Sequence, residues 1–210
     1  MTDTKAALLA AAHTVVGREG IAGTSARVVA AEAGVNQALV FYHFGTVTEL
    51  VATACTEAAD ASVASYREEL AAVGSFTELL AVGRTLHERE QASGNLAVMA
   101  QLMAGAQRDP LLAAAAQHAM EAWNREVEIA VRRVLADSPL LEITDRAGLA
   151  RAIGAGFIGL ELYEGVDAEG AQQALAALEQ LGAVAEILDD LGPVARRAVR
   201  ARLRRTSRST

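Results

Sequence analysis

The chain of 210 residues contains little cysteine, proline or aromatic side chain. It has one cysteine, Cys55, three prolines, and an aromatic content of only 4 %. A single cysteine excludes an internal disulfide, which favours a reducing compartment, and we expect a cytoplasmic protein. No run of about 18 apolar residues is present, so no membrane span is expected. The first residues also lack the basic, apolar and small-residue pattern of a secretory signal.

Acidic and basic residues are unevenly distributed along the chain, whose net charge is −7. Residues 1–50 carry three basic and four acidic side chains, and residues 51–192 carry nine and twenty-two. Residues 193–210 carry seven arginines and no acid. Charge alone therefore does not predict a nucleic-acid partner. The acidic middle is explained by solvated helix faces, although a preference for cationic effectors is an alternative.

Alanine and leucine, the residues that lose least on entering a helix, fill much of the chain, so we predict an all-α fold. Apolar residues recur at helical spacing, and Gly, Ser, Asp and Pro interrupt them. The predicted helices cover residues 4–18, 25–33, 36–44, 49–72 (starting near 47), 76–92, 95–107, 110–136, 146–164 and 168–190. The last residues, Thr206–Thr210, are predicted to be disordered.

The segment Ser25–Phe44 predicts two short helices that cross around a tight turn. Thr24 is predicted to cap the first helix and Asn36 the second. Gly34 supplies the turn, where a positive φ is costly for any residue with a Cβ atom. An apolar set would hold the two helices together: Val29, Ala33, Val35 and Val40. In this geometry the exposed N-terminal end of the second helix enters the major groove of DNA.

Residues Gly20 to Leu50 resemble the signature of the TetR (tetracycline-repressor-like) family. The matching features are Thr24-Ser25, Ala33-Gly34-Val35, Tyr42-His43-Phe44, and Leu50 six residues after Phe44. The resemblance covers about a quarter of the chain and implies a DNA-binding transcriptional regulator. It also implies an N-terminal three-helix domain with a helix-turn-helix and a C-terminal helical bundle that binds an effector and dimerises.

The resemblance also implies which residues contact DNA. The candidates are Thr24, Ser25, Arg27, Asn36, Gln37, Ala38, Leu39, Tyr42 and His43. Of these, Gln37 is suited to an adenine edge and Ala38 to a thymine methyl group. Two positions depart from the family, which commonly has tyrosine at Phe41 and lysine at Val47 to contact phosphates. Since both contacts are lost, we expect DNA affinity to depend only weakly on salt.

Other residues that bear chemistry have simpler explanations. The histidines His13, His43, His87 and His118 lack metal-ligand spacing, so we expect no metal and no cofactor. Cys55 is interpreted as a small apolar residue, with a redox sensor as the alternative. Effector-binding candidates are Met99, Leu102, Met103, Trp123 and Phe157, although such residues more often form a core. The sequence has no nucleophile–base pair at a recognisable spacing and no phosphate-binding loop, so we do not expect an enzyme.

These observations predict three regions: residues 1–47 as the DNA-binding domain, 48–192 as the effector-binding and dimerisation domain, and 193–210 as a basic tail. Helices 146–164 and 168–190 are the predicted homodimer interface, where Gly154, Gly156 and Gly159 permit close approach. A twofold dimer reads a pseudo-palindromic operator. The tail is predicted to be either a helix docked on the acidic bundle or an arm that contacts DNA. The opposite charges of the tail and the bundle favour docking.

The predicted function is a repressor that a small molecule of unknown identity releases from DNA; an activator is the alternative that the sequence does not exclude. The alternative from another class is a helical ligand-binding or adaptor protein whose hairpin is purely structural. Such a protein would shift no DNA fragment in a gel, and replacing Gln37 would leave its function unchanged.

Overall fold

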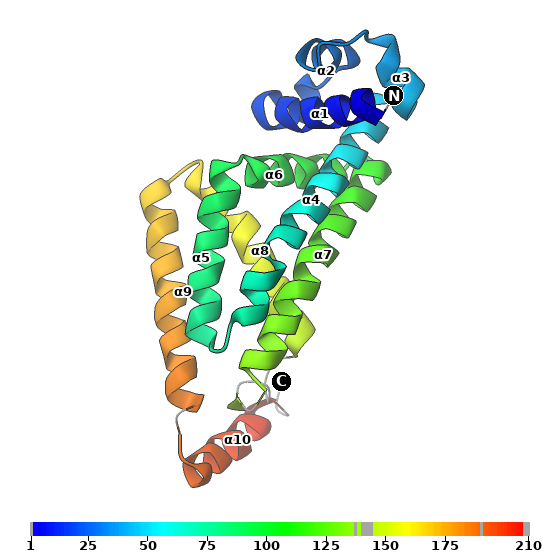
Figure 1. The fold of residues 1–210 in the computed structure, drawn as a ribbon. Coiled ribbons are helices and arrows are strands. Elements are labelled where there is room, and N and C mark those ends of the chain that lie inside the picture. Colours follow the sequence, from blue (N-terminus) through cyan, green and yellow to red (C-terminus); the bar gives the residue numbers. More distant parts are fainter. Residues whose placement is uncertain (1, 137, 140–144, 190, 208–210) are drawn as a thin grey trace. The chain divides into compact units, whose positions relative to one another are not determined.

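In a computed structural model of the chain, the described residues are 2–136, 138–139, 145–189 and 191–207, and they contain ten α-helices and no strand. The all-α prediction is therefore confirmed (Figure 1). The helices are α1 (Thr2–Gly23), α2 (Ala26–Glu32), α3 (Ala38–Phe44), α4 (Val47–Ala72), α5 (Phe76–Ala92), α6 (Asn95–Ala106), α7 (Pro110–Val134), α8 (Arg146–Glu164), α9 (Ala168–Asp189) and α10 (Pro193–Ser207). Across these residues no single helix is both long and apolar enough to cross a membrane, and α3 and α4 pass that test only as a pair bent by 65°.

Most predicted helices agree with the observed ones. Gly20 interrupts α1 as predicted, because its dihedrals are not helical (φ 71°, ψ 171°), although helical residues follow it as far as Gly23. One prediction is wrong. Thr206 and Ser207 are not disordered but complete α10, because no Gly or Pro follows Pro193 to end that helix. The rest of that prediction, residues 208–210, lies outside the described residues, as does Asp137.

The chain forms two compact units. Unit 1 consists of Met1–Ser65 and Arg89–Ala122, and unit 2 consists of Tyr66–Glu88 and Trp123–Thr210. Helices α4, α5 and α7 each begin in one unit and continue into the other. The boundaries that we predict from the sequence, after residues 47 and 192, remain predictions.

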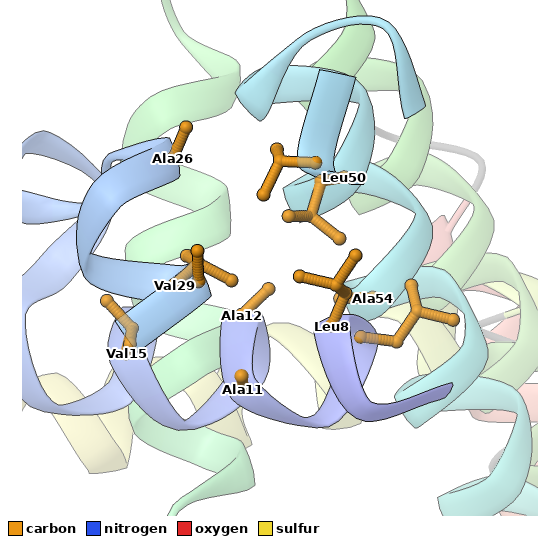
Figure 2. Close-up of a cluster of buried hydrophobic side chains, with 11 residues drawn as sticks. Leu8, Ala11, Ala12, Val15, Ala26, Val29, Leu50 and Ala54 are labelled. Carbon is orange, nitrogen blue, oxygen red and sulfur yellow. The ribbon is translucent and has the colours of Figure 1, made fainter. Parts of the chain in front are cut away.

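A first core cluster in unit 1 joins α1, α2, α3 and the start of α4. Figure 2 shows Leu8, Ala12 and Val15 of α1 gathered with Val29 of α2 and Leu50 of α4. All five side chains are fully buried. Burial at helical spacing along α1 explains why this stretch is helical, since one face must leave water. The cluster fixes α2 and α3 against α1.

A second core cluster in unit 1 joins α1 to α4, α6 and α7. Its buried members are Val16, Val51, Cys55, Val98, Leu102, Leu112, Ala115 and Ala116. The helices α1 and α6 approach closely, because a Cβ atom at Gly17 would lie 3.3 Å from Val98 Cγ2. The first helix of the chain therefore packs simultaneously on α2 and on α6.

Unit 2 has its own core, formed by residues of α4, α5, α7 and α8. The rings of Tyr66 and Trp123 pack there with centroids 5.9 Å apart. The side chain of Arg133 donates through Nε to the carbonyl oxygen of Val73 at 2.8 Å, which satisfies backbone just beyond the end of α4. Helix α8 also packs against α9.

Candidate DNA interface

Helix α2 begins with a side-chain cap at Ser25. Ser25 has extended dihedrals (φ −131°, ψ 158°), and its Oγ accepts a hydrogen bond from the backbone N–H of Val28 at 3.4 Å. The prediction that Thr24 caps this helix is wrong. The Thr24 hydroxyl instead donates to the carbonyl oxygen of Gly20 at 2.8 Å, because the break at Gly20 leaves that carbonyl within its reach.

The turn between α2 and α3 is closed by two backbone hydrogen bonds. Val35 N–H donates to Ala30 C=O at 3.0 Å, and Gly34 N–H donates to Ala31 C=O at 3.2 Å. Together with φ +66° at Gly34, these bonds form a Schellman motif, in which a left-handed residue follows the helix end. The turn that we predict at Gly34 is therefore present, and it is the conformation that glycine adopts at least cost.

The start of α3 is capped by Asn36. Its Oδ1 accepts the backbone N–H of Ala38 at 2.8 Å, and the intervening Gln37 already has helical dihedrals (φ −54°, ψ −32°). Asn36 thus performs the capping role that the sequence predicts, although the helix is assigned from Ala38. The side chains of Asn36, Gln37 and Ala38 are all exposed.

The four apolar residues predicted to hold α2 and α3 together all contribute to the first core cluster. Val29 and Val40 are fully buried, and Ala33 and Val35 pack against them from partly buried positions. The turn and this cluster fix the orientation of α3, so the exposed start of α3 is held on a rigid base. Two short helices joined in this way form the helix-turn-helix unit that enters a major groove.

The nine DNA-binding candidates all lie in this one segment of unit 1, at different degrees of exposure. Ser25, Arg27, Asn36, Gln37, Ala38 and Tyr42 are exposed, whereas Thr24, Leu39 and His43 are partly buried. Tyr42 is 70 % exposed, and its ring contacts that of His43 edge to face at 5.0 Å between centroids. Leu39 packs against the first core cluster, which gives it a structural role as well.

The cations of this segment differ in their availability. Arg18 is engaged by two carboxylates, at 2.9 Å from Glu19 and 2.9 Å from Glu32, and these hydrogen bonds raise the pKa of its guanidinium. The Lys5 ammonium group lies 5.8 Å from the centroid of the Phe44 ring. Arg27 is exposed in the first turn of α2. Of these three cations, Arg27 is exposed, whereas Arg18 is held by carboxylates and Lys5 lies over an aromatic ring.

The five effector-binding candidates belong to three separate environments. In unit 1, Leu102 is fully buried in the second core cluster, and Met99 and Met103 pack against it. In unit 2, Trp123 packs against Tyr66, whereas the Phe157 ring lies 5.8 Å from that of His87. Leu102 and Trp123 thus have the core roles that the sequence left as the alternative.

Comparison with known proteins links this geometry to a family. Residues 8–54 match the family model for bacterial regulatory proteins of the tetR family, a range that runs from Leu8 of α1 to Ala54 of α4. A search of curated proteins finds no match. The matched residues include the cap at Ser25, the turn at Gly34 and the start of α3.

Solved structures match over most of the chain. A protein of Rhodococcus sp. described as a TetR-family transcriptional regulator has 24 % identity and a TM-score of 0.70, covering 88 % of this chain and 99 % of its own. A transcriptional regulator of Streptomyces coelicolor A3(2) has 24 % identity and a TM-score of 0.65, over 85 % and 98 % of the two chains. A regulator of Saccharomonospora viridis in complex with choline has 17 % identity and a TM-score of 0.71, over 86 % and 97 %. The chain therefore carries the N-terminal domain of the TetR family of bacterial regulators, on the all-helical fold of TetR-family transcriptional regulators.

Proposed function

We propose that the chain is a sequence-specific DNA-binding transcriptional regulator, and that it acts as a repressor. The observation that carries the proposal is the capped helix-turn-helix itself. Its turn is closed at Gly34, and Asn36, Gln37 and Ala38 stand exposed at the start of α3. Exposed amide side chains at that position are suited to reading base edges in the major groove. Such a protein works in the cytoplasm, where bacterial DNA lies.

The backbone contacts of the proposal come from residues around α2 and α3. Some phosphates would be contacted by residues at the start of α2, namely Thr24, Ser25 and Arg27. Other phosphates would be contacted by Tyr42 and His43 of α3. Phosphate contacts fix the register of the protein on the duplex, whereas base contacts specify the sequence. Gln37 is assigned to an adenine edge and Ala38 to a thymine methyl group.

A homodimer is part of the proposal, and α8 and α9 are its interface. Large apolar side chains are exposed on these helices and the turn between them: Leu162, Tyr163, Val166, Leu178 and Ile187. A Cβ atom at Gly156 or Gly159 would meet nothing within 4 Å, so a partner helix has room to approach there. Large apolar side chains exposed on a pair of packed helices favour an interaction site there. Light scattering of the protein at micromolar concentration tests this, and a monomer would contradict it.

A small cationic molecule is the proposed effector, and its candidate contacts are considered separately in each unit: Met99 and Met103 in unit 1, and Phe157 in unit 2. The acidic excess of residues 51–192 supports a cation, and the fold is shared with a regulator solved with choline. A ligand shifts DNA affinity only by its differential affinity for the two states. Release of bound DNA by choline, but not by its uncharged isostere 3,3-dimethylbutanol, is the expected result in a gel-shift titration. Equal effects of the two compounds would contradict a cationic effector.

The decisive experiment is selection of bound sequences from random DNA with the full chain. A pseudo-palindromic consensus, with half-sites about 34–36 Å apart or somewhat more, is the expected outcome for a twofold dimer. No enrichment would instead favour the alternative, a helical adaptor or ligand-binding protein with a structural hairpin. Transcription from a promoter that carries the consensus then separates a repressor from an activator.

A further inference from the structure

Three side chains from distant parts of the sequence converge in unit 2. His87 lies on α5, and Glu161 and Glu164 lie on the last turn of α8. One ring nitrogen of His87 and one carboxylate oxygen of each glutamate all lie within 4.8 Å of one another. His87 Nε2 and Glu164 Oε2 are 3.3 Å apart. Two atoms at that separation, each about 2.1 Å from a common ion, subtend an angle close to tetrahedral.

The cluster is buried and contains polar atoms without a hydrogen-bond partner. His87 is only 7 % exposed, and both glutamates are partly buried. Within the described residues, His87 Nδ1 and Glu161 Oε2 are buried and accept or donate no hydrogen bond. Buried polar groups in proteins are nearly always paired, so atoms left in this way indicate a missing ligand or water. A cation bound in the cluster would be contacted by Glu161 Oε2, the carboxylate oxygen that has no hydrogen-bond partner among the described residues.

Helix packing positions the three ligands. Glu161 and Glu164 are three residues apart and therefore share one face of α8. Phe157, one turn before Glu161, lies against the His87 ring at 5.8 Å between centroids. A Cβ atom at Gly83, one turn before His87, would lie 3.0 Å from Phe157 Cζ, so α5 and α8 approach closely here. The aromatic contact holds the imidazole ring beside the carboxylates and limits its rotation.

The charge of the cluster also favours a cation. Two carboxylates in a partly buried site repel each other unless a positive charge lies between them. One imidazole and two carboxylates form a donor set that suits Zn²⁺ and other divalent first-row ions, whereas Mg²⁺ and Ca²⁺ prefer oxygen donors alone.

We propose that His87, Glu161 and Glu164 bind one divalent transition-metal ion, with one imidazole nitrogen and two carboxylate oxygens as protein ligands and water completing the coordination. Three protein ligands plus an open position is the pattern of a site that exchanges a ligand. The site lies wholly in unit 2 and does not depend on the DNA-binding residues of unit 1. The alternative is a hydrogen-bonded His87–Glu164 pair with no metal.

Metal titration of the untagged, chelator-treated full chain tests the proposal. Zn²⁺ binding is followed by calorimetry, and Co²⁺ binding by its visible absorption, whose intensity reports the coordination number and geometry of the bound ion. The test variants are Glu161→Gln and Glu164→Gln, which keep the side-chain shape and remove the ligand charge. The control is Glu68→Gln, because Glu68 is an exposed carboxylate elsewhere in unit 2. Circular dichroism checks that each variant is folded.

One metal ion per chain is expected, with a rise in melting temperature that a chelator reverses, since a ligand that binds only the native state stabilises it. Each test variant should bind Zn²⁺ about 100-fold more weakly or worse, because even outer-shell partners of metal ligands are worth roughly 10- to 100-fold. Glu68→Gln should bind like the unaltered chain. The proposal is overturned if the unaltered chain shows no saturable binding, or if Glu161→Gln and Glu164→Gln bind the metal as tightly as Glu68→Gln.

Discussion

Arg18 of α1 forms an ion pair with Glu32 of α2, with 2.9 Å between Nη1 and Oε2. The pair links the first two helices of the DNA-binding segment and occupies one of its few cations. Both side chains are substantially exposed, so the pair contributes little to stability. Its main consequence is electrostatic, because a guanidinium held by two carboxylates is less available to a phosphate.

Glu32→Gln should therefore strengthen DNA binding. The change frees Arg18 from one partner and removes one negative charge from each chain, so we expect tighter binding and a steeper salt dependence, by up to about two phosphate contacts per dimer. Fluorescence anisotropy with labelled operator DNA at several salt concentrations measures both effects. Melting temperature should be nearly unchanged. Weaker binding by Glu32→Gln would show that the ion pair supports the DNA-bound conformation.

Replacing Arg27 should have the opposite effect. If Lys5 and Arg27 of both chains contact phosphates, the slope of log K against log salt is about −4 per dimer, and Arg27→Ala should reduce its magnitude by about 2. The loss should be similar for every DNA sequence, because phosphate contacts carry no sequence information. Arg125→Ala, an exposed arginine in unit 2, is the control. A slope equivalent to about ten contacts in the unaltered dimer would contradict the prediction.

Gln37→Ala should relax sequence specificity more than it lowers overall affinity. The side chain is exposed at the start of α3, and a lost bidentate contact to adenine costs about 1–3 kcal/mol at one base position. Binding to operators with single base changes should show a loss of discrimination at that position alone. Gln117→Ala, an exposed residue of α7, should change nothing. A uniform loss of affinity across all operators would argue for a phosphate contact instead.

The loss of stability caused by a substitution at Gly34 should follow the backbone preference of the new residue and not the size of its side chain. A Cβ atom there would meet nothing within 4 Å, but the φ of +66° is strained for any residue with a side chain. Gly34→Ala should cost about 1–2 kcal/mol. Gly34→Asn should cost less, because asparagine adopts the left-handed conformation more readily despite its larger side chain. Urea unfolding measures the free energy of unfolding of both variants. A greater loss for Gly34→Asn than for Gly34→Ala would indicate a steric clash instead.

Cys55 should be unreactive in the native protein. Burial in the second core cluster raises the pKa of the thiol to about 12, so at pH 8 only about one molecule in 10⁴ carries a thiolate. The pKa of the native thiol exceeds that of the unfolded thiol, so the contribution of Cys55 to stability is fully present below about pH 8.5 and is lost as the pH rises towards 12. Labelling with a thiol reagent at pH 8 should be slow and should accelerate in urea. Rapid stoichiometric labelling of the native protein would revive the redox-sensor alternative.

Much of the helical framework was predictable because its signals are local. Asp145 caps α8 through the N–H of Gly148, and the predicted range 146–164 matches Arg146–Glu164. The turn at Gly34 was predictable for the same reason, since a helix end and its left-handed residue are adjacent in the chain. The cap of α2 was predicted one residue too early, because Thr24 and Ser25 are both residue types that cap helices; the structure shows that Thr24 donates to Gly20 and that Ser25 accepts from Val28.

The sequence by itself determined the helical class, the helix-turn-helix and the candidate residues that would face DNA, because periodicity, caps and turns act over a few residues. Only the tertiary structure decided which charges are engaged and which polar groups meet. Arg18 and Glu32 are 14 residues apart, and His87 and Glu164 are 77 residues apart. No spacing rule predicts such contacts, because they depend on how helix faces pack around a core that many distant side chains build together.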